Sequence, residues 1–241
     1  MSLSHEVGIF PTRIVLENRK IDGDAWPRNV DAVMFRLPAR KKDSPQEIND
    51  DVLAQRIHDS LNKSGWCVMF AYGSIENKLR PFDFALKMRA KGLVCVDVIT
   101  LTKPWWGGKR SDTHLACSHE YVFLFTKADR WYLDRACVFP ILAGDKDEAS
   151  CPGNSWRLAN YNPAEVYPRD VAATVLKMLS LLPGSVVLDP LMGGSAGLES
   201  AVACGYSFIG YEADEKVFKK YEKVVNKLKG SIKERDEEHK L

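Results

Sequence analysis

The sequence predicts an α/β fold built on a mainly parallel sheet with helices on both faces. Short apolar segments, typical of buried parallel strands, alternate along the chain with segments whose apolar residues recur at helical spacing. This alternation is typical of strand–helix–strand units. One such unit, over residues 185–212, carries a glycine-rich turn between its strand and its helix. We therefore expect a ligand site at the carboxyl edge of the sheet.

The N-terminal half of the chain is predicted to form strands and helices in alternation. We expect strands over 13–16, 29–35, 66–72 and 93–101, and helices over 48–61 and 74–90. In the first helix, Val52, Leu53, Ile57 and Leu61 recur at helical spacing and are predicted to face the core. In the second, the predicted core-facing residues are Phe82, Phe84, Ala85 and Met88.

The C-terminal half begins with a strand over 121–125, which we expect to run antiparallel to its neighbour. An irregular connection is expected over 128–160, then a helix over 168–182, opened by Pro168, and a strand over 186–188. A helix with Ser195 as its N-cap, a strand over 208–211 and a last helix over 214–229 complete the pattern. We expect one domain over residues 1–230 and a charged, frayed tail over 231–241.

Composition excludes several classes of protein. The 241 residues are 45% hydrophobic and carry a net charge of +2, so the chain can bury a full core and any basic surface must be local. Its six cysteines include no CxxC pair and no Cys/His cluster of metal spacing, which favours reduced thiols and predicts no metal site. No segment has the length of a membrane span, so we expect a soluble intracellular protein, cytoplasmic or, in a eukaryote, nuclear.

The glycine-rich turn is a candidate cofactor site. Glycines there allow a tight turn and close approach of the backbone to a ligand. Glu212, at the end of the following strand, is placed to accept hydrogen bonds from ribose hydroxyls. The alternative is a tight turn without a ligand. The candidate cofactor residues in this segment are Asp189, Pro190, Leu191, Gly193, Gly194, Ser195, Ala196 and Glu212.

The segment LDPLMGGSAGLESAVACGYSFIGYEAD resembles the cofactor segment of S-adenosylmethionine-dependent DNA amino-methyltransferases, which methylate adenine N6 or cytosine N4. Three further segments are similar to motifs of this family, namely residues 100–127, residues 154–168 and the strand Val30–Phe35. Their order is that of the permuted subclasses. The resemblance implies a class I methyltransferase-like (Rossmann-like) sheet of seven strands with one antiparallel strand. It also implies S-adenosyl-L-methionine as cofactor, with Phe35 in its site.

The resemblance also locates the catalytic position. The family carries Asp, Asn or Ser, then Pro-Pro, then an aromatic residue, because the amine needs proton acceptors and the flipped base needs a ring to stack on. Here the sequence is Arg36-Leu37-Pro38-Ala39, so Arg36 and Pro38 occupy candidate catalytic positions. Arginine is a donor only and cannot accept the amine proton. An acid and a proline recur at Asp43 and Pro45, as an alternative position.

A loop over residues 103–119 combines cations with aromatic rings, as single-strand and flipped-base sites do. Alternatively, its tryptophans anchor the loop to the core and its charges are solvated. The pair His119-Glu120 is interpreted as the start of a strand rather than as a catalytic pair. The candidate nucleic-acid-binding residues are Lys103, Trp105, Trp106, Lys109, Arg110 and His114.

The leading hypothesis is an S-adenosylmethionine-binding DNA amino-methyltransferase with a noncanonical catalytic loop at residues 35–40. The first alternative is an inactive relative that binds nucleic acid or activates a partner, and the second is a small-molecule methyltransferase. DNA is favoured over RNA as the partner. The segment 128–153 is too short for a folded target-recognition insert, so site choice would need a homodimer or a second subunit, or the protein would have little sequence specificity.

Overall fold

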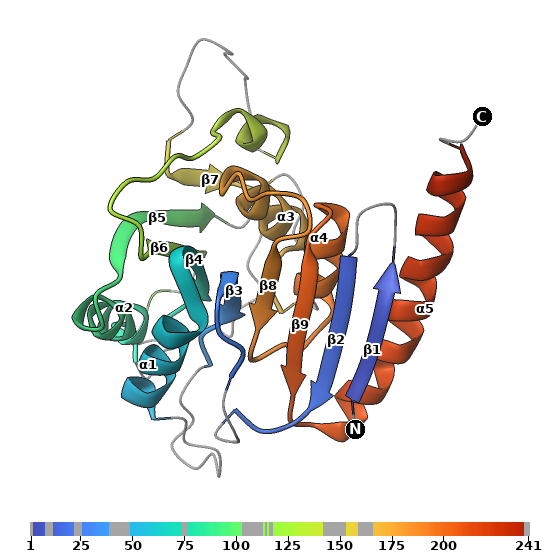
Figure 1. Cartoon of the computed structure of the whole chain (residues 1–241). Coiled ribbons are helices and arrows are strands. Elements are labelled where there is room, and N and C mark those ends of the chain that lie inside the picture. The colour runs from blue at the N-terminus through green and yellow to red at the C-terminus, as the bar shows by residue number, and fades with distance from the viewer. Residues whose placement is uncertain are drawn as a thin grey trace.

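The computed structural model describes residues 2–7, 12–21, 26–38, 49–73, 77–102, 113, 115, 118–141, 153–158 and 166–238. Nine strands form one sheet in the order β1-β2-β9-β8-β3-β4-β6-β5-β7 (Figure 1). The strands are β1 (Ser2–Val7), β2 (Thr12–Asn18), β3 (Val30–Arg36), β4 (Leu61–Ala71), β5 (Val94–Thr102), β6 (His119–Thr126), β7 (Ser155–Arg157), β8 (Val186–Asp189) and β9 (Ser207–Glu212). The helices are α1 (Asp50–Ser60), α2 (Arg80–Ala90), α3 (Arg169–Met178), α4 (Ala196–Ala203) and α5 (Glu215–Glu238), with a 3-10 helix over Ala136–Ile141.

The sheet is mainly parallel, as the sequence predicts. Strands β2, β9, β8, β3, β4, β5 and β7 share one direction, while β1 and β6 run against it. The seven strands from β2 to β5 in the sheet order form the expected sheet, with β6 as its antiparallel strand. Strands β1 and β7 add one edge strand on each side.

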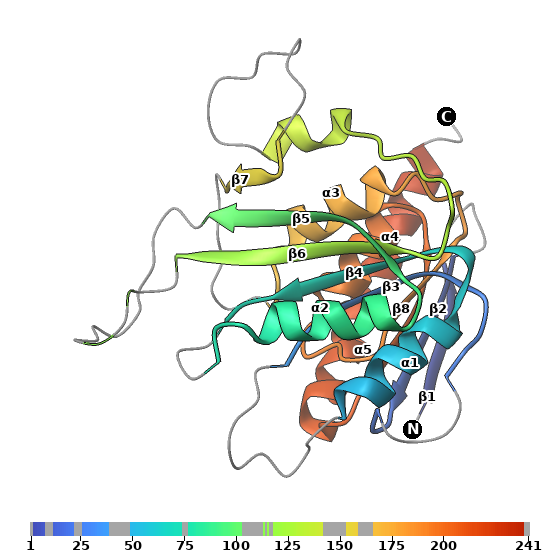
Figure 2. The same cartoon turned by 90° about the vertical axis from the view of Figure 1, so that its left-hand side faces the viewer.

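Helices cover both faces of this sheet (Figures 1 and 2). Neighbouring residues of a strand point to opposite faces, so Val33 and Phe35 pack with α1 and α2, whereas Ala32 and Met34 pack with α3, α4 and α5. The two apolar clusters lie on either side of the sheet, and the strands between them are buried on both faces. This three-layer arrangement confirms the predicted fold class.

Several element boundaries differ from the prediction. Strand β4 begins at Leu61, directly after α1, whereas the sequence predicts its start at Trp66. Helix α2 begins at Arg80 rather than near residue 74, with Pro81 in its first turn, where the missing N–H costs no helical hydrogen bond. Helix α3 ends at Met178, and the segment predicted as irregular contains β7 and the 3-10 helix.

Two residues predicted to face the core are exposed. Val52 of α1 is 46% exposed and Phe82 of α2 is 39% exposed. Helical spacing identifies a stripe of apolar residues but not its edges, and both residues lie at the edge of theirs. Helix α5 runs from Glu215 to Glu238, beyond the predicted end of the last helix at residue 229. Within the described part of the chain, no helix has the length and apolar character needed to cross a membrane.

Candidate functional site

The winding of the sheet reverses between the adjacent strands β8 and β3. The chain leaves β8 through α4 to reach β9, and it leaves β3 through α1, on the other face, to reach β4. Open α/β sheets bind ligands outside the carboxyl ends of the strands at such a reversal. A pocket of about 520 Å³ lies at this edge, within the size range of small-molecule sites. We call it the switch pocket.

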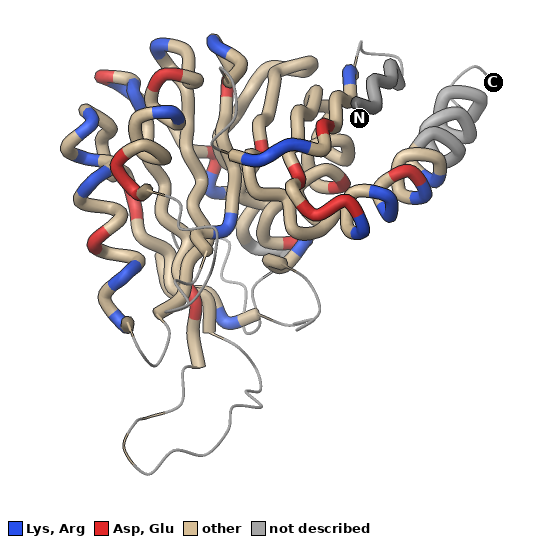
Figure 3. Tube along the Cα trace, turned by 90° about the horizontal axis from the view of Figure 1, so that it is seen from below, with Lys and Arg blue, Asp and Glu red and all other residues tan. Residues whose placement is uncertain are grey.

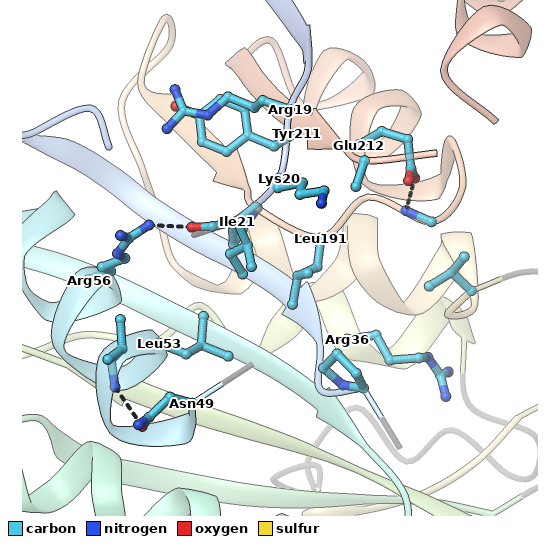
Figure 4. Close-up of a pocket in the computed structure, with 16 residues that line it drawn as sticks. Arg19, Lys20, Ile21, Arg36, Asn49, Leu53, Arg56, Leu191, Tyr211 and Glu212 are labelled. Atoms are coloured by element: carbon cyan, nitrogen blue, oxygen red, sulfur yellow. Dashed lines mark hydrogen bonds between the residues drawn. The ribbon is translucent and has the colours of Figure 1, made fainter. Parts of the chain in front are cut away.

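Four strand ends and one helix line the switch pocket (Figure 4). The turn after β2, the turn after β8, the end of β9 and the end of β3 meet here, and the first turns of α1 close the side. The lining residues used below are Arg19, Lys20, Arg36, Pro38, Leu191, Gly193, Tyr211 and Glu212. Figure 3 views this edge from below and shows basic and acidic positions along its rim.

Buried hydrogen bonds fix the turn after β8. The carboxylate of Asp189 is fully buried and accepts from the backbone N–H of Leu191 at 3.0 Å and from the Tyr167 hydroxyl at 2.8 Å. The Tyr167 ring stacks on Phe70, with 4.4 Å between ring centroids. A Cβ at Gly197 would lie 2.3 Å from the Tyr167 hydroxyl oxygen and 3.0 Å from Asp189 Oδ2, so this contact requires glycine.

Burial sets the protonation of this pair. It raises the pKa of Asp189 to about 7, and the nearby Glu212 carboxylate adds to the rise. Burial and the Asp189 charge raise the pKa of Tyr167 well above its usual value, so the hydroxyl stays protonated and donates. The two side chains therefore hold the turn from beneath.

Glu212 connects the end of β9 to the glycine turn. Its Oε2 accepts from the Gly193 N–H at 3.0 Å and from the Tyr221 hydroxyl at 3.2 Å, while Oε1 accepts from the Asp214 N–H at 2.9 Å. Gly193 has a φ of 55°, a conformation that glycine adopts without strain. The carboxylate thus faces the pocket from a fixed position and retains capacity to accept further hydrogen bonds.

Alternating cations and rings form one wall of the pocket. The Arg19 guanidinium lies 4.3 Å from the Tyr211 ring centroid, and Tyr211 packs edge-to-face on Trp26 at 6.3 Å. The Arg56 guanidinium lies 5.9 Å from the Trp26 ring centroid and also donates to the Ile21 carbonyl. These contacts fix the turn after β2 against β9 and α1.

The catalytic position at the end of β3 holds an ion pair. Arg36 Nη2 lies 2.7 Å from Glu120 Oε2, and the side chains of Arg36 and Glu120 are 17% and 4% exposed. The carbonyl of Pro38 accepts from Arg80 Nε at 2.9 Å. Arg80 in turn makes a two-point ion pair with Asp50, at 2.8 and 3.1 Å. The chain after β3 is thereby tied to α1 and α2.

The structure brings six of the predicted site residues together. Those lining the switch pocket are Arg36, Pro38, Pro190, Leu191, Gly193 and Glu212. Asp189 lies beneath the turn and is fully buried. Phe35 is fully buried against Phe84 on the α2 side, with ring centroids 6.1 Å apart, and does not line the pocket.

Three predicted cofactor residues do not line the pocket: Gly194 and Ser195 precede α4, and Ala196 is its first residue. Ser195 stands at the N-cap position, as predicted, but its side chain does not cap the helix. Its hydroxyl donates instead to Glu199 at 2.6 Å, and Glu199 pairs with Arg169 at 2.5 Å. The acidic side chain in the first turn of α4 competes for the serine hydroxyl.

Other predicted residues lie outside the described part of the chain. These are the nucleic-acid-binding candidates Lys103, Trp105, Trp106, Lys109, Arg110 and His114, together with Ala39, Asp43 and Pro45. The pair His119-Glu120 does begin a strand, as interpreted from the sequence. Its position beside Arg36 gives Glu120 an additional contact in the site.

Sequence reasoning missed the residues that the turn after β2 and the helix α1 contribute. Arg19, Lys20 and Arg56 line the pocket, although none belongs to a motif, and so does Tyr211, which the sequence places in a strand without a role in the site. One signal could have identified them. Carboxyl ends of neighbouring parallel strands meet at one edge, so the polar residues after the predicted strand 13–16 belong near those after 186–188 and 208–211.

Three solved structures are similar to this chain in fold. The cytosine-N4-specific PvuII DNA methyltransferase matches with a TM-score of 0.67 at 15% identity, over 90% of this chain and 88% of that one. The M1.HpyAVI–SAM complex matches with a TM-score of 0.57 at 19% identity, over 81% and 89%. A putative DNA modification methylase from Thermus thermophilus, complexed with S-adenosyl-L-methionine, matches with a TM-score of 0.60 at 16% identity, over 85% and 88%.

At these identities the structural matches show the fold alone. A search of curated protein sequences gives no match. The sequence model of the DNA methylase family of N6 and N4 methyltransferases matches residues 52–223. This segment contains most of α1, the whole of the glycine turn and β9, and it spans more than half of the chain. The chain therefore belongs to the N6/N4 DNA methylase family.

Proposed function

We propose that the chain binds S-adenosyl-L-methionine in the switch pocket and transfers its methyl group to the exocyclic amine of a DNA base. One observation carries the proposal. A single pocket joins the glycine turn and Glu212 to Arg36 and Pro38, the positions of the family's catalytic tetrapeptide. Family membership supports the reaction type, and two of the solved structures of similar fold contain this cofactor.

The lining suits a nucleoside cofactor. Glu212 presents a carboxylate that can accept hydrogen bonds from ribose hydroxyls. Leu191 and Leu53 offer apolar surface for a base, and the glycine at position 193 leaves room for a close approach of the ligand. When bound, the cofactor supplies an electrophilic methyl group on a sulfonium. The protein's part is to hold that group beside the end of β3.

The backbone after β3 keeps one acceptor for the reacting amine. Arg36 donates only, but the carbonyl of Leu37, which precedes Pro38, is an acceptor of the kind the reaction requires. The Leu37 N–H donates to the Phe70 carbonyl at 2.8 Å, and Arg80 holds the Pro38 carbonyl. In the transfer, the Leu37 carbonyl would orient the amine by a hydrogen bond; the amine nitrogen would form a bond to the methyl carbon as the carbon–sulfur bond breaks with its electron pair on sulfur, and the amine proton would pass to solvent water.

A second candidate function is a catalytically inactive subunit that binds nucleic acid or activates a partner. The ion pair between Arg36 and Glu120 favours it, because a guanidinium stands where the family has an acceptor side chain. Such a subunit would keep the switch pocket and lack transfer. Cofactor binding alone does not separate the two functions, whereas transfer does.

The test is transfer of labelled methyl from S-adenosyl-L-methionine to unmethylated DNA and RNA, followed by identification of the modified base. We expect label in DNA as N6-methyladenine or N4-methylcytosine. Binding of the cofactor without label in either nucleic acid would contradict the proposed transfer and favour the inactive subunit. Label in RNA alone would contradict the choice of DNA.

Replacing Glu212 with alanine is expected to weaken S-adenosyl-L-methionine binding by about 10- to 150-fold, because hydrogen bonds to a charged group are worth about 1.5–3 kcal/mol. The change also removes the partner of the Gly193 N–H. Calorimetric titration measures the affinity. Glu215→Ala is the matched control, since Glu215 lies in the first turn of α5 and pairs with Lys219 in solvent. Equal S-adenosyl-L-methionine affinities of the two variants would contradict the assignment of Glu212 to the cofactor site.

A further inference from the structure

An exposed tyrosine stands at the end of β4, next to the catalytic position. Tyr72 follows the last residue of the strand and is 38% exposed. The chain turns at once, since a Cβ at Gly73 would lie 2.6 Å from the Lys78 carbonyl oxygen. The backbone that follows Tyr72 is therefore held by a close contact that only glycine allows.

Arg36 lies between this ring and the switch pocket. Its side chain lines the pocket, and Figure 4 shows its guanidinium directed away from Leu191 and Lys20. The guanidinium carbon lies 5.5 Å from the Tyr72 ring centroid. Arg36 Nε is buried and has no hydrogen-bond partner among the described residues. A buried donor without a partner is costly, so a turn of the Arg36 side chain that brings Nε to a ligand acceptor gains a hydrogen bond that the protein itself leaves unmade.

Glu120 completes the group from a third strand. Because β6 is antiparallel to β4, its first residues lie at the edge where β3 and β4 end. Glu120 is thereby placed 2.7 Å from Arg36 Nη2. Its carboxylate fixes one side of the guanidinium and leaves Nε for another partner. We call Tyr72, Arg36 and Glu120 the Tyr72 cluster.

We propose that the Tyr72 cluster receives the target base, with the Tyr72 ring stacking on it and Arg36 Nε donating to a ring nitrogen. The inference rests on the proposed function and names the residues that take over base recognition from the missing aromatic side chain. Tyr72 supplies the ring that position 39 lacks, from the neighbouring strand. Glu120 is a positioning residue that acts through Arg36.

The chemistry of the cluster selects amino bases. In adenine and cytosine, the ring nitrogen beside the exocyclic amine is an acceptor, which fits a guanidinium donor. In guanine and thymine, the corresponding ring nitrogen carries a hydrogen and would face Arg36 donor to donor. The cluster is therefore expected to bind adenine or cytosine in preference to guanine or thymine, next to the methyl group that the switch pocket holds.

The test measures binding of fluorescein-labelled single-stranded oligo-dT whose central nucleotide is A, C, G or T, with and without S-adenosylhomocysteine. Wild-type protein should bind the strand with A or C most tightly. Tyr72→Ala should weaken that binding by about 5- to 150-fold, the range for loss of one base–aromatic stack. Tyr72→Phe keeps the ring and should bind as wild type. Tyr132→Ala, a change at a tyrosine that is 70% exposed outside the cluster, is the matched control.

Arg36→Lys tests the donor. Lysine keeps a cation for Glu120 but lacks the Nε–H, so the preference for A or C over T should disappear while the protein stays folded. Glu120→Gln should reduce the same preference, because the guanidinium loses its charged partner. Both variants keep a polar partner at the substituted position, so their unfolding temperatures should stay close to that of the wild type while the base preference falls.

Two results separate the inference from the proposed function. If wild-type protein methylates DNA while Tyr72→Ala and Tyr132→Ala bind strands equally, the Tyr72 cluster is not the base site and the proposed function stands. If strand binding depends on Tyr72 and Arg36 but S-adenosyl-L-methionine does not bind, the cluster is supported and the proposed function fails. Absence of any preference among the four strands in wild-type protein would overturn the inference.

Discussion

Replacing Arg80 with methionine is expected to lower the free energy of unfolding by about 3–5 kcal/mol, the cost of breaking a buried ion pair by removing one partner. The side chains of Arg80 and Asp50 are 8% and 5% exposed, and both guanidinium Nη atoms contact the carboxylate. The third donor, Nε, holds the Pro38 carbonyl. The variant should therefore be less stable, and the chain that follows β3 should also lose the hydrogen bond that holds the Pro38 carbonyl.

Urea denaturation measures the first effect, and Lys87→Met provides the control. Lys87 also joins α2 to α1, through Asp51, but this pair is exposed to solvent and should contribute little. Equal denaturation midpoints for Arg80→Met and Lys87→Met would show that the buried pair has no special role. The second effect should appear as weaker methyl transfer under conditions where the Arg80 variant is still folded.

Asp189 is expected to make the protein less stable as the pH rises from about 4 to about 7. Burial raises its pKa from 3.8 to about 7, so the folded state holds a proton that the unfolded state releases. The stability from this group is fully present below the unfolded pKa of 3.8 and is lost as the pH rises through the folded pKa near 7. At about 1.4 kcal/mol per pKa unit, the whole loss is about 4 kcal/mol.

Thermal unfolding of wild type and Asp189→Asn at a series of pH values tests this dependence. Asparagine can still accept from the Leu191 N–H but does not titrate. The variant should gain stability relative to wild type between about pH 4 and about pH 7 and keep a constant difference above that range. Parallel profiles of the two proteins would show that Asp189 is ionised in the folded state at all these pH values.

The fold could be predicted from the sequence because its elements have strong local patterns. The runs Trp66–Tyr72 and Val30–Phe35 are too apolar for a strand with a solvent face, and the buried β4 and β3 confirm this. The boundaries of the elements are harder to predict from the sequence, as the early start of β4 at Leu61 shows. Polar residues at positions 62–64 do not indicate a strand, and in the structure they lie in a register shift, between the pairs Leu61–Val30 and Trp66–Ala32.

The site could be predicted only where a motif marks it. Glycines and an acid at fixed spacing identified Gly193 and Glu212, which line the switch pocket. The proposed roles of Tyr72 and Glu120 depend on the strand order, because β4 lies between β3 and β6 and so brings the start of β6, far away in the sequence, to the end of β3. Burial likewise separates Asp189 and Phe35 from the pocket wall, and spacing alone carries no information on burial.

The most direct test of the central claim is a calorimetric titration of the wild-type protein with S-adenosyl-L-methionine. We predict saturable binding at one site, because the switch pocket joins the glycine turn, Glu212 and the end of β3 in one space. Absence of saturable binding by a folded protein would contradict the assignment of this pocket to the cofactor, and with it the proposed methyl transfer.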